Sequence, residues 1–149
     1  MNIIIFGCGR TGAVLAQQLS KTHQVTVVEQ NPEALSRLGY KHSCKVVLGS
    51  GLDMDTLEKA GIKNADMFFA LTRGDNTNLM AGQMARMTFN VERVVMRVAD
   101  MHRAEAYRKL GYVCLTPALL LAGMMVDMTN GDEYKPIEEY NQLPKEMAL

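Results

Sequence analysis

Six short runs of apolar, mostly β-branched residues alternate with helix-like segments, and this alternation restricts the fold more than any other feature of the sequence. The runs cover residues 2–6, 24–29, 44–49, 65–72, 92–98 and 112–116. Strands that alternate with helices are typical of a parallel sheet with helices on both faces. Because crossovers between parallel strands are right-handed, we predict an α/β fold with a doubly wound, six-stranded parallel sheet of the Rossmann type.

Cap signals mark the helices between these runs. Asn31 followed by Pro32 is expected to open a helix that ends at Gly39, and Asp53 is expected to open one that ends at Gly61. Asp75 or Asn76 is expected to cap the next helix, which runs to Phe89, and Asp100 is expected to cap one that runs to Leu110. Thr116 followed by Pro117 is expected to open a final helix that ends near Met128.

Methionines form an apolar pattern in the second half of the chain. Met80, Met84 and Met87 recur at helical spacing. Such residues usually fill a hydrophobic core, so we expect these side chains to be buried. The last expected helix, "PALLLAGMMVDM", is apolar on more than one face, which predicts that it packs against a second chain in a dimer interface.

Composition is that of a folded protein. The 149 residues suit one domain, and an apolar fraction of 48% with zero formal net charge disfavours both disorder and nucleic-acid binding. From Asn130 onward there are five acids and two bases, so we expect a Rossmann-type domain over residues 1–128 and an acidic tail over 129–149. Neither a secretory leader nor a membrane-spanning segment is apparent, which predicts a cytoplasmic protein.

The stretch "IIIFGCGRTGAVLAQQL" places Gly7, Gly9 and Gly12 in a G-x-G-x-x-G frame directly after the first expected strand. A dinucleotide-binding fingerprint requires this position between strand and helix. Gly7 would make the tight turn, Gly9 would let the backbone approach a pyrophosphate, and Gly12 would let the helix pack closely. The helix N-terminus would then hold phosphate oxygens. A plain strand-to-helix turn is the alternative.

Glu29 ends the second run, 22 positions after Gly7. This is close to the spacing of about 20 residues expected for the acid that binds the ribose hydroxyls. A carboxylate there would repel a 2′-phosphate and so disfavour NADP. Arg10 lies inside the loop and is a candidate for pairing with a phosphate. For both residues the alternative is an ordinary surface charge.

The sequence provides no evident catalytic apparatus beside this loop. His23, His42 and His102 do not closely follow the carboxyl end of a strand and are expected at the surface. Cys8 is either a small packed residue or a redox-sensitive thiol, and the three cysteines lack metal-site spacing. We therefore predict a sensor without catalysis. The alternatives are a small NAD-dependent oxidoreductase or dehydrogenase fragment, and a dimerising module with a vestigial pocket.

Several motifs appear in order over residues 1–126: "GCGRTG", "VVEQNPEAL", "GSGLDMDTLEKAGIKNAD", "ALTRGDNTNLMAGQMAR", "VVMRVAD" and "LGYVCLTPALLLA". With them the sequence resembles the TrkA N-terminal, or RCK, family of cytoplasmic Rossmann domains. The resemblance implies a nucleotide site that comprises Gly7, Cys8, Gly9, Arg10, Thr11, Gly12, Glu29, Gln30, Ser50, Gly51, Leu52, Thr72, Arg73, Asn76 and Arg97. Ser50, Asn76 and Met96 depart from the family's usual acid, glutamate and alanine.

The resemblance also implies what such a site serves. Members are non-enzymatic regulatory subunits that bind NAD(H) or AMP, ADP or ATP and gate a membrane potassium channel or transporter from its cytoplasmic side. They form homodimers and often higher rings such as octamers, and pairing with a related chain is a further expectation here. Many members continue into a second ligand-binding domain. A stand-alone subunit, one half of a pair and a shortened chain therefore remain open.

Overall fold

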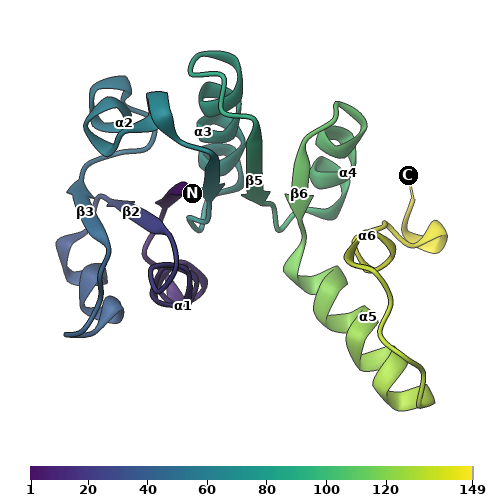
Figure 1. Cartoon of the computed structure of the whole chain (residues 1–149). Helices are drawn as coiled ribbons and strands as arrows, with labels where there is room; N and C mark the ends of the chain where they lie inside the picture. The colour runs from purple at the N-terminus through teal and green to yellow at the C-terminus, as the bar shows by residue number, and fades with distance from the viewer. Residues whose placement is uncertain (149) are drawn as a thin grey trace. The chain divides into compact units, whose positions relative to one another are not determined.

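The computed structural model describes residues 1–148, in which strands and helices alternate as predicted (Figure 1). The strands are β1 (Asn2–Phe6), β2 (Gln24–Glu29), β3 (Lys45–Leu48), β4 (Met67–Ala70), β5 (Arg93–Arg97) and β6 (Val113–Leu115). The α-helices are α1 (Arg10–Leu19), α2 (Met54–Ala60), α3 (Asp75–Met87), α4 (Met101–Lys109), α5 (Pro117–Asn130) and α6 (Ile137–Tyr140). Short 3₁₀ helices cover Pro32–Leu38 (η1), Ile62–Asn64 (η2) and Lys145–Met147 (η3). The strand order β3-β2-β1-β4-β5-β6 is that of a doubly wound sheet and confirms the predicted fold class.

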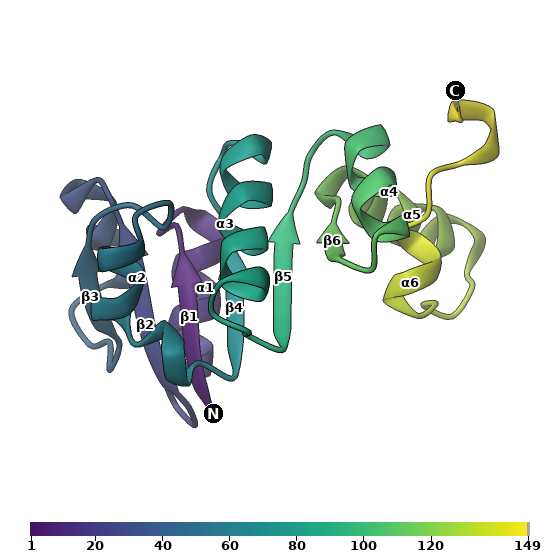
Figure 2. The ribbon, with the colours of Figure 1, turned by 90° about the horizontal axis from the view of Figure 1, so that it is seen from above.

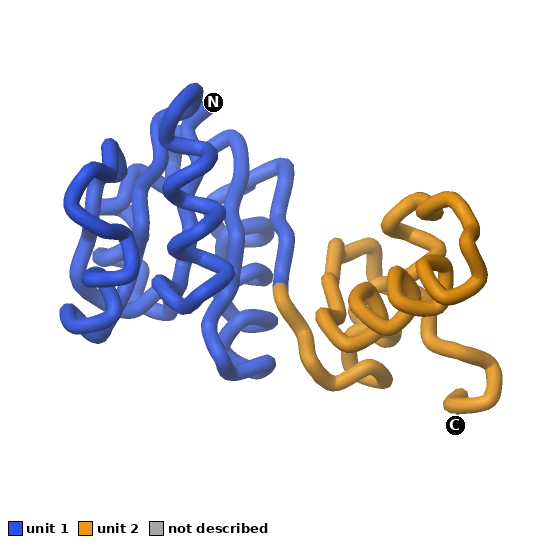
Figure 3. Tube along the Cα trace, turned by 90° about the horizontal axis from the view of Figure 1, so that it is seen from below, with its two compact units in different colours: residues 1–96 blue, residues 97–149 orange. Residues whose placement is uncertain are grey.

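The chain divides into two compact units, Met1–Met96 and Arg97–Leu149, which we call the N-terminal and C-terminal units (Figure 3). Within residues 1–148, no helix has both the length and the apolar character needed to cross a membrane. We predicted that the Rossmann-type domain ends at residue 128, whereas the two compact units meet at residues 96 and 97. The extent of the family domain stays a prediction.

The N-terminal unit is built around β1, whose neighbours β2 and β4 run parallel to it (Figure 2). Phe6 lies opposite Val28 on one side and Ala70 on the other, so the carboxyl ends of three strands meet at one edge. Helix α1 covers one face of the sheet, and α2 and α3 cover the other (Figure 1). The side chains of residues 3–6 are at most 2% exposed, as expected for a central parallel strand.

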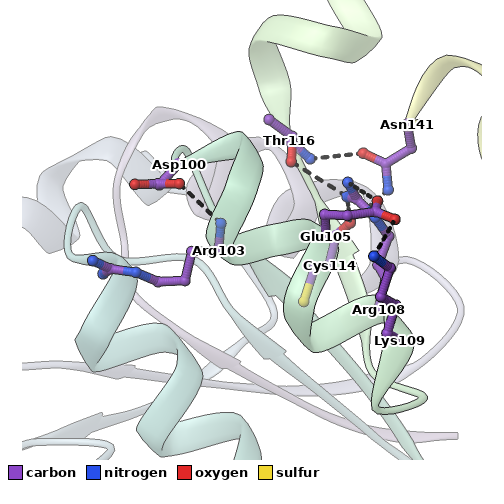
Figure 4. Close-up of polar contacts among 8 residues, drawn as sticks. All are labelled: Asp100, Arg103, Glu105, Arg108, Lys109, Cys114, Thr116 and Asn141. Atoms are coloured by element: carbon purple, nitrogen blue, oxygen red, sulfur yellow. Dashed lines mark hydrogen bonds and ion pairs between the residues drawn. The ribbon is translucent and has the colours of Figure 1, made fainter. Parts of the chain in front are cut away.

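Most predicted caps are confirmed by hydrogen bonds. Asn31 accepts from Glu33 N–H (3.0 Å), Asp53 accepts from Thr56 N–H (3.0 Å), and Asp100 accepts from Arg103 N–H (2.9 Å; Figure 4). The segment after Asn31 is a 3₁₀ helix rather than an α-helix.

The predicted cap of α3 was wrong, because the N-cap residue is Gly74 and Asp75 is already the first helical residue. The turn before α3 is instead organised by Asn78. Its Oδ1 accepts from Thr72 N–H (2.9 Å), and its Nδ2 donates to Thr72 O (3.0 Å).

The predicted burial of the methionine stripe was also wrong. Met80 is 55% exposed and Met87 is 72% exposed, while Met84 is half-buried. The buried residues of α3 are Asn78, Leu79, Ala81, Gly82 and Ala85. A Cβ on Gly82 would overlap the Met96 side chain, so the helix packs too closely at this point for a larger side chain, and Met80 and Met87 lie on its exposed side.

The C-terminal unit is organised around α5. Leu119 and Asp127 are buried, whereas five large apolar side chains of this helix are exposed: Leu121, Met124, Met125, Val126 and Met128. The predicted role of this helix in a dimer interface stays a prediction. The residues after Asn130 pack onto α5. The Tyr140 ring lies over Gly123, where an added Cβ would come 2.5 Å from it.

Asp127 anchors this tail. Its buried carboxylate accepts from Tyr140 Oη (2.6 Å) and from Lys135 Nζ (3.0 Å). The Tyr140 hydrogen bond, and then the Lys135 ammonium, lower the pKa of Asp127. Proximity to the same carboxylate raises the pKa of Lys135.

We expect acid to loosen the tail. The contribution of Asp127 is complete above the ordinary aspartate pKa of about 3.9 and is lost as the pH falls through its lower folded-state value. The protection factor of the Lys135 amide, which donates to Tyr140 Oη, should fall over this range. Asp127→Asn should be less protected at neutral pH and less sensitive to acid. Identical pH profiles for the two proteins would contradict the assignment.

Candidate nucleotide-binding site

The loop between β1 and α1 has the backbone geometry that its glycines predicted. Gly7 has a φ of +107°, in the left-handed region, and its N–H donates to Val28 O (2.9 Å). A Cβ at Gly7 would lie 3.0 Å from the Leu71 backbone. A Cβ at Gly12 would lie 2.0 Å from Gly7 O, so α1 packs directly on the loop.

Gly9 has the opposite character, because it is the open position of the loop. It is the N-cap residue of α1, without a side-chain cap, and no heavy atom lies within 4 Å of the point where its Cβ would be. Gly9, Arg10 and Thr11 are exposed. The first N–H groups of a helix lack acceptors within the helix and attract anions, so at Gly9 the loop presents the N-terminus of α1 to solvent.

Glu29 lies against the same loop. Its Oε2 accepts from Cys8 N–H (2.6 Å) and its Oε1 accepts from Asn31 N–H (2.9 Å). The carboxylate therefore has a fixed position between the loop and η1. A carboxylate can accept about four hydrogen bonds, which leaves capacity for ribose hydroxyls. Gln30 follows at an exposed position.

The turn after β3 lies beside β2. Gly49 N–H donates to Glu29 O (3.0 Å), and Ser50 Oγ accepts from Leu52 N–H (3.1 Å). Gly51 is buried where a Cβ would overlap the Phe6 ring. Ser50, Gly51 and Leu52 thus lie at the carboxyl end of the strand next to Glu29, on the side where the resemblance places an adenine.

The turn after β4 forms the other side of the loop. Leu71 and Thr72 contribute the backbone atoms nearest to a Cβ at Gly7. Arg73 and Asn76 follow at exposed positions in the same turn and the start of α3. Arg97 begins the C-terminal unit, and its predicted role toward the distal phosphates stays a prediction.

Sequence reasoning missed Arg37. This residue of η1 is exposed, and its Nη1 donates to Cys8 O (3.5 Å), which places a guanidinium beside the loop. Because η1 folds back onto α1, no local pattern could have pointed to this contact.

Cys8 behaves as a packed thiol. Its side chain is fully buried, and burial, followed by the Glu29 carboxylate, raises its pKa. The protonated form is the less reactive one, so this environment favours packing over redox chemistry. His42 and His102 are exposed and His23 is half-buried. Among residues 1–148, no group of three or more His, Cys, Asp or Glu residues is placed to hold a metal ion.

An open glycine loop at a helix N-terminus, a fixed acid at the end of β2 and the 3-2-1-4-5-6 strand order define a Rossmann-type domain with a dinucleotide fingerprint. The family model of the TrkA-N domain matches residues 3–115. The chain belongs to the TrkA-N domain family, which confirms the predicted family.

Two relatives illustrate the similarity. The Trk system potassium uptake protein TrkA of Streptomyces coelicolor is 46% identical over 112 residues, which are 74% of this chain and 50% of that protein. A TrkA homolog of Methanothermobacter thermautotrophicus is 35% identical over 112 residues, 74% of this chain and 51% of that protein. This chain therefore matches about half the length of these relatives.

Solved structures share the fold. The AMP-bound Kef C-terminal domain of Shewanella denitrificans has a TM-score of 0.71 at 22% identity, covering 95% of this chain and 89% of that one. The GsuK channel bound to NAD has a TM-score of 0.67 at 24% identity, covering 82% of this chain and 22% of that one.

Proposed function

We propose that this chain is a nucleotide-sensing regulatory domain of a potassium uptake system. The N-terminal unit binds NAD(H) or an adenine nucleotide, and the bound state biases a membrane potassium channel or transporter. The observation that carries the proposal is the Glu29 carboxylate held against Cys8 N–H beside the open Gly9 position. They place a carboxylate that can accept hydrogen bonds from ribose hydroxyls next to a helix N-terminus that can bind a phosphate.

The chemistry of the site suits an adenosine phosphate. Phosphate oxygens at Gly9 would accept hydrogen bonds from the N–H groups of the first turn of α1, where the helix dipole favours negative charge. Arg10 and Arg37 add positive charge near the loop. The Glu29 carboxylate would accept from the ribose hydroxyls and repel a 2′-phosphate, so NAD is preferred over NADP.

Relatives support the choice of system and ligand. Two are named as Trk potassium uptake proteins, and the solved neighbours include one domain bound to AMP and one channel bound to NAD. On this proposal the chain acts at the cytoplasmic side of the membrane through its partner. The exposed apolar side chains of α5 would support a homodimer or a higher ring.

The proposal separates sensing from catalysis, and a turnover assay tests this. Beside the loop, the Glu29 carboxylate is held by two backbone N–H groups and the Cys8 thiol is buried, so neither group is placed to act as the proton donor that hydride transfer requires. NADH absorbance should stay constant when the protein is mixed with alcohols, aldehydes or quinones at concentrations that saturate nucleotide binding. Steady turnover, lost in Gly12→Ala, would instead support a small oxidoreductase.

A further inference from the structure

Among residues 1–148, β6 is the last strand in the strand order, so no strand lies on its other side. Side-chain direction and hydrogen-bonding direction both alternate along a strand. Leu115 O accepts from Val98 N–H (3.0 Å), so this residue bonds toward the chain that follows β5. The backbone groups of Cys114 and Thr116 therefore point the other way, toward the free edge.

The carboxamide of Asn141 occupies that edge (Figure 4). Its Nδ2 donates to Cys114 O (2.5 Å), and its Oδ1 accepts from Thr116 N–H (2.9 Å). In a parallel pair, one residue donates to the residue before its partner and accepts from the residue after it. Asn141 reproduces this pattern with its side chain, and it is 6% exposed. One amide group thus stands in for the peptide unit of a seventh strand.

Two further contacts hold this substitute in place. Tyr140, the neighbour of Asn141, is bonded to Asp127 of α5 (2.6 Å). Arg108 Nη1 donates to the same Cys114 O (3.0 Å; Figure 4), while Arg108 Nη2 is paired with Glu105 Oε2 (3.3 Å). A groove of about 530 Å³ remains between α5 and the tail. Beside this groove, the contacts of Tyr140 and Asn141 hold the tail.

We propose that residues 137–141 are an edge cap, in which Asn141 replaces a strand and prevents a second copy of this chain from pairing with β6. Exposed strand edges are templates for pairing. Two β6 edges are self-complementary about a two-fold axis, and the zero formal net charge of the chain provides no general repulsion between copies. This role goes beyond the nucleotide-sensing function and does not depend on it.

Asn141→Ala in the full chain tests the proposal, with Gln142→Ala, at an exposed neighbouring position, as the matched control. In Asn141→Ala, the Thr116 amide should exchange about tenfold faster. Sedimentation velocity should show an assembly larger than that of the wild type, which grows with protein concentration. The amides of Ile4 and Ile5 in β1 serve as the internal reference for an intact fold.

A double variant locates the contact. Val113 of β6 is 51% exposed, and lysine on an edge strand opposes pairing. Asn141→Ala with Val113→Lys should keep fast exchange at Thr116 but return to the wild-type assembly. Unchanged Thr116 exchange in Asn141→Ala, fast exchange without added association, or equal association of the single and double variants would each overturn the edge cap.

Discussion

Replacing Gly12 with alanine should destabilise the N-terminal unit and abolish nucleotide binding. The new Cβ would lie 2.0 Å from Gly7 O, so α1 must move away from the loop, and its N–H groups move with it. Overpacking of this kind costs about 1–3 kcal/mol. We expect a lower free energy of unfolding in urea and an affinity for AMP or NAD reduced more than about 100-fold, which corresponds to 2.8 kcal/mol or more.

Gly9→Ala is the matched control, because it adds the same methyl group to the same loop. No heavy atom lies within 4 Å of its Cβ position, so the stability loss should stay below about 1 kcal/mol, that of a poorer N-cap. Nucleotide affinity should nevertheless fall, because the methyl group occupies the space into which a pyrophosphate would fit. Wild-type affinity in Gly9→Ala would show that no phosphate lies there.

Glu29→Ala should weaken nucleotide binding by roughly 1–3 kcal/mol through the loss of charged hydrogen bonds to the ribose. The variant also leaves Cys8 N–H and Asn31 N–H without their acceptor, so some stability is lost as well. A second readout separates these effects. The preference for NAD over NADP should narrow, because repulsion of the 2′-phosphate disappears. Titration of both dinucleotides measures this, and an unchanged preference with unchanged affinity would reduce Glu29 to a structural acid.

The fold was predictable because its signals are local. The bounds of β1 and β2 are those of the two apolar runs, and the caps at Asn31, Asp53 and Asp100 involve partners two or three residues away. The face that α3 buries was not predictable in this way. Helical spacing shows that Met80, Met84 and Met87 share a side, but only the close packing around Gly82 decides that the side is exposed.

The geometry of the glycine loop was predictable to the same extent. Gly7, Gly9, Gly12 and Glu29 follow a fixed spacing, and the tight turn at Gly7 and the close packing at Gly12 agree with it. Their role in binding a nucleotide stays a prediction. Contacts between distant segments left no such pattern. Arg37 is 29 residues from Cys8, and Asn141 is 27 residues from Cys114. The sequence alone therefore could not show that the Arg37 guanidinium lies beside the glycine loop, or that Asn141 lies at the edge of β6.

Isothermal titration calorimetry of the intact chain with AMP, ADP, ATP, NAD⁺ and NADH tests the central claim most directly. The protein should first be freed of any bound nucleotide, which mass spectrometry of the denatured sample would identify. We predict saturable binding of at least one of these ligands at one site per chain, weakened in Gly9→Ala although that variant remains folded. A folded protein that gives no binding heat with any of the five ligands would contradict the account.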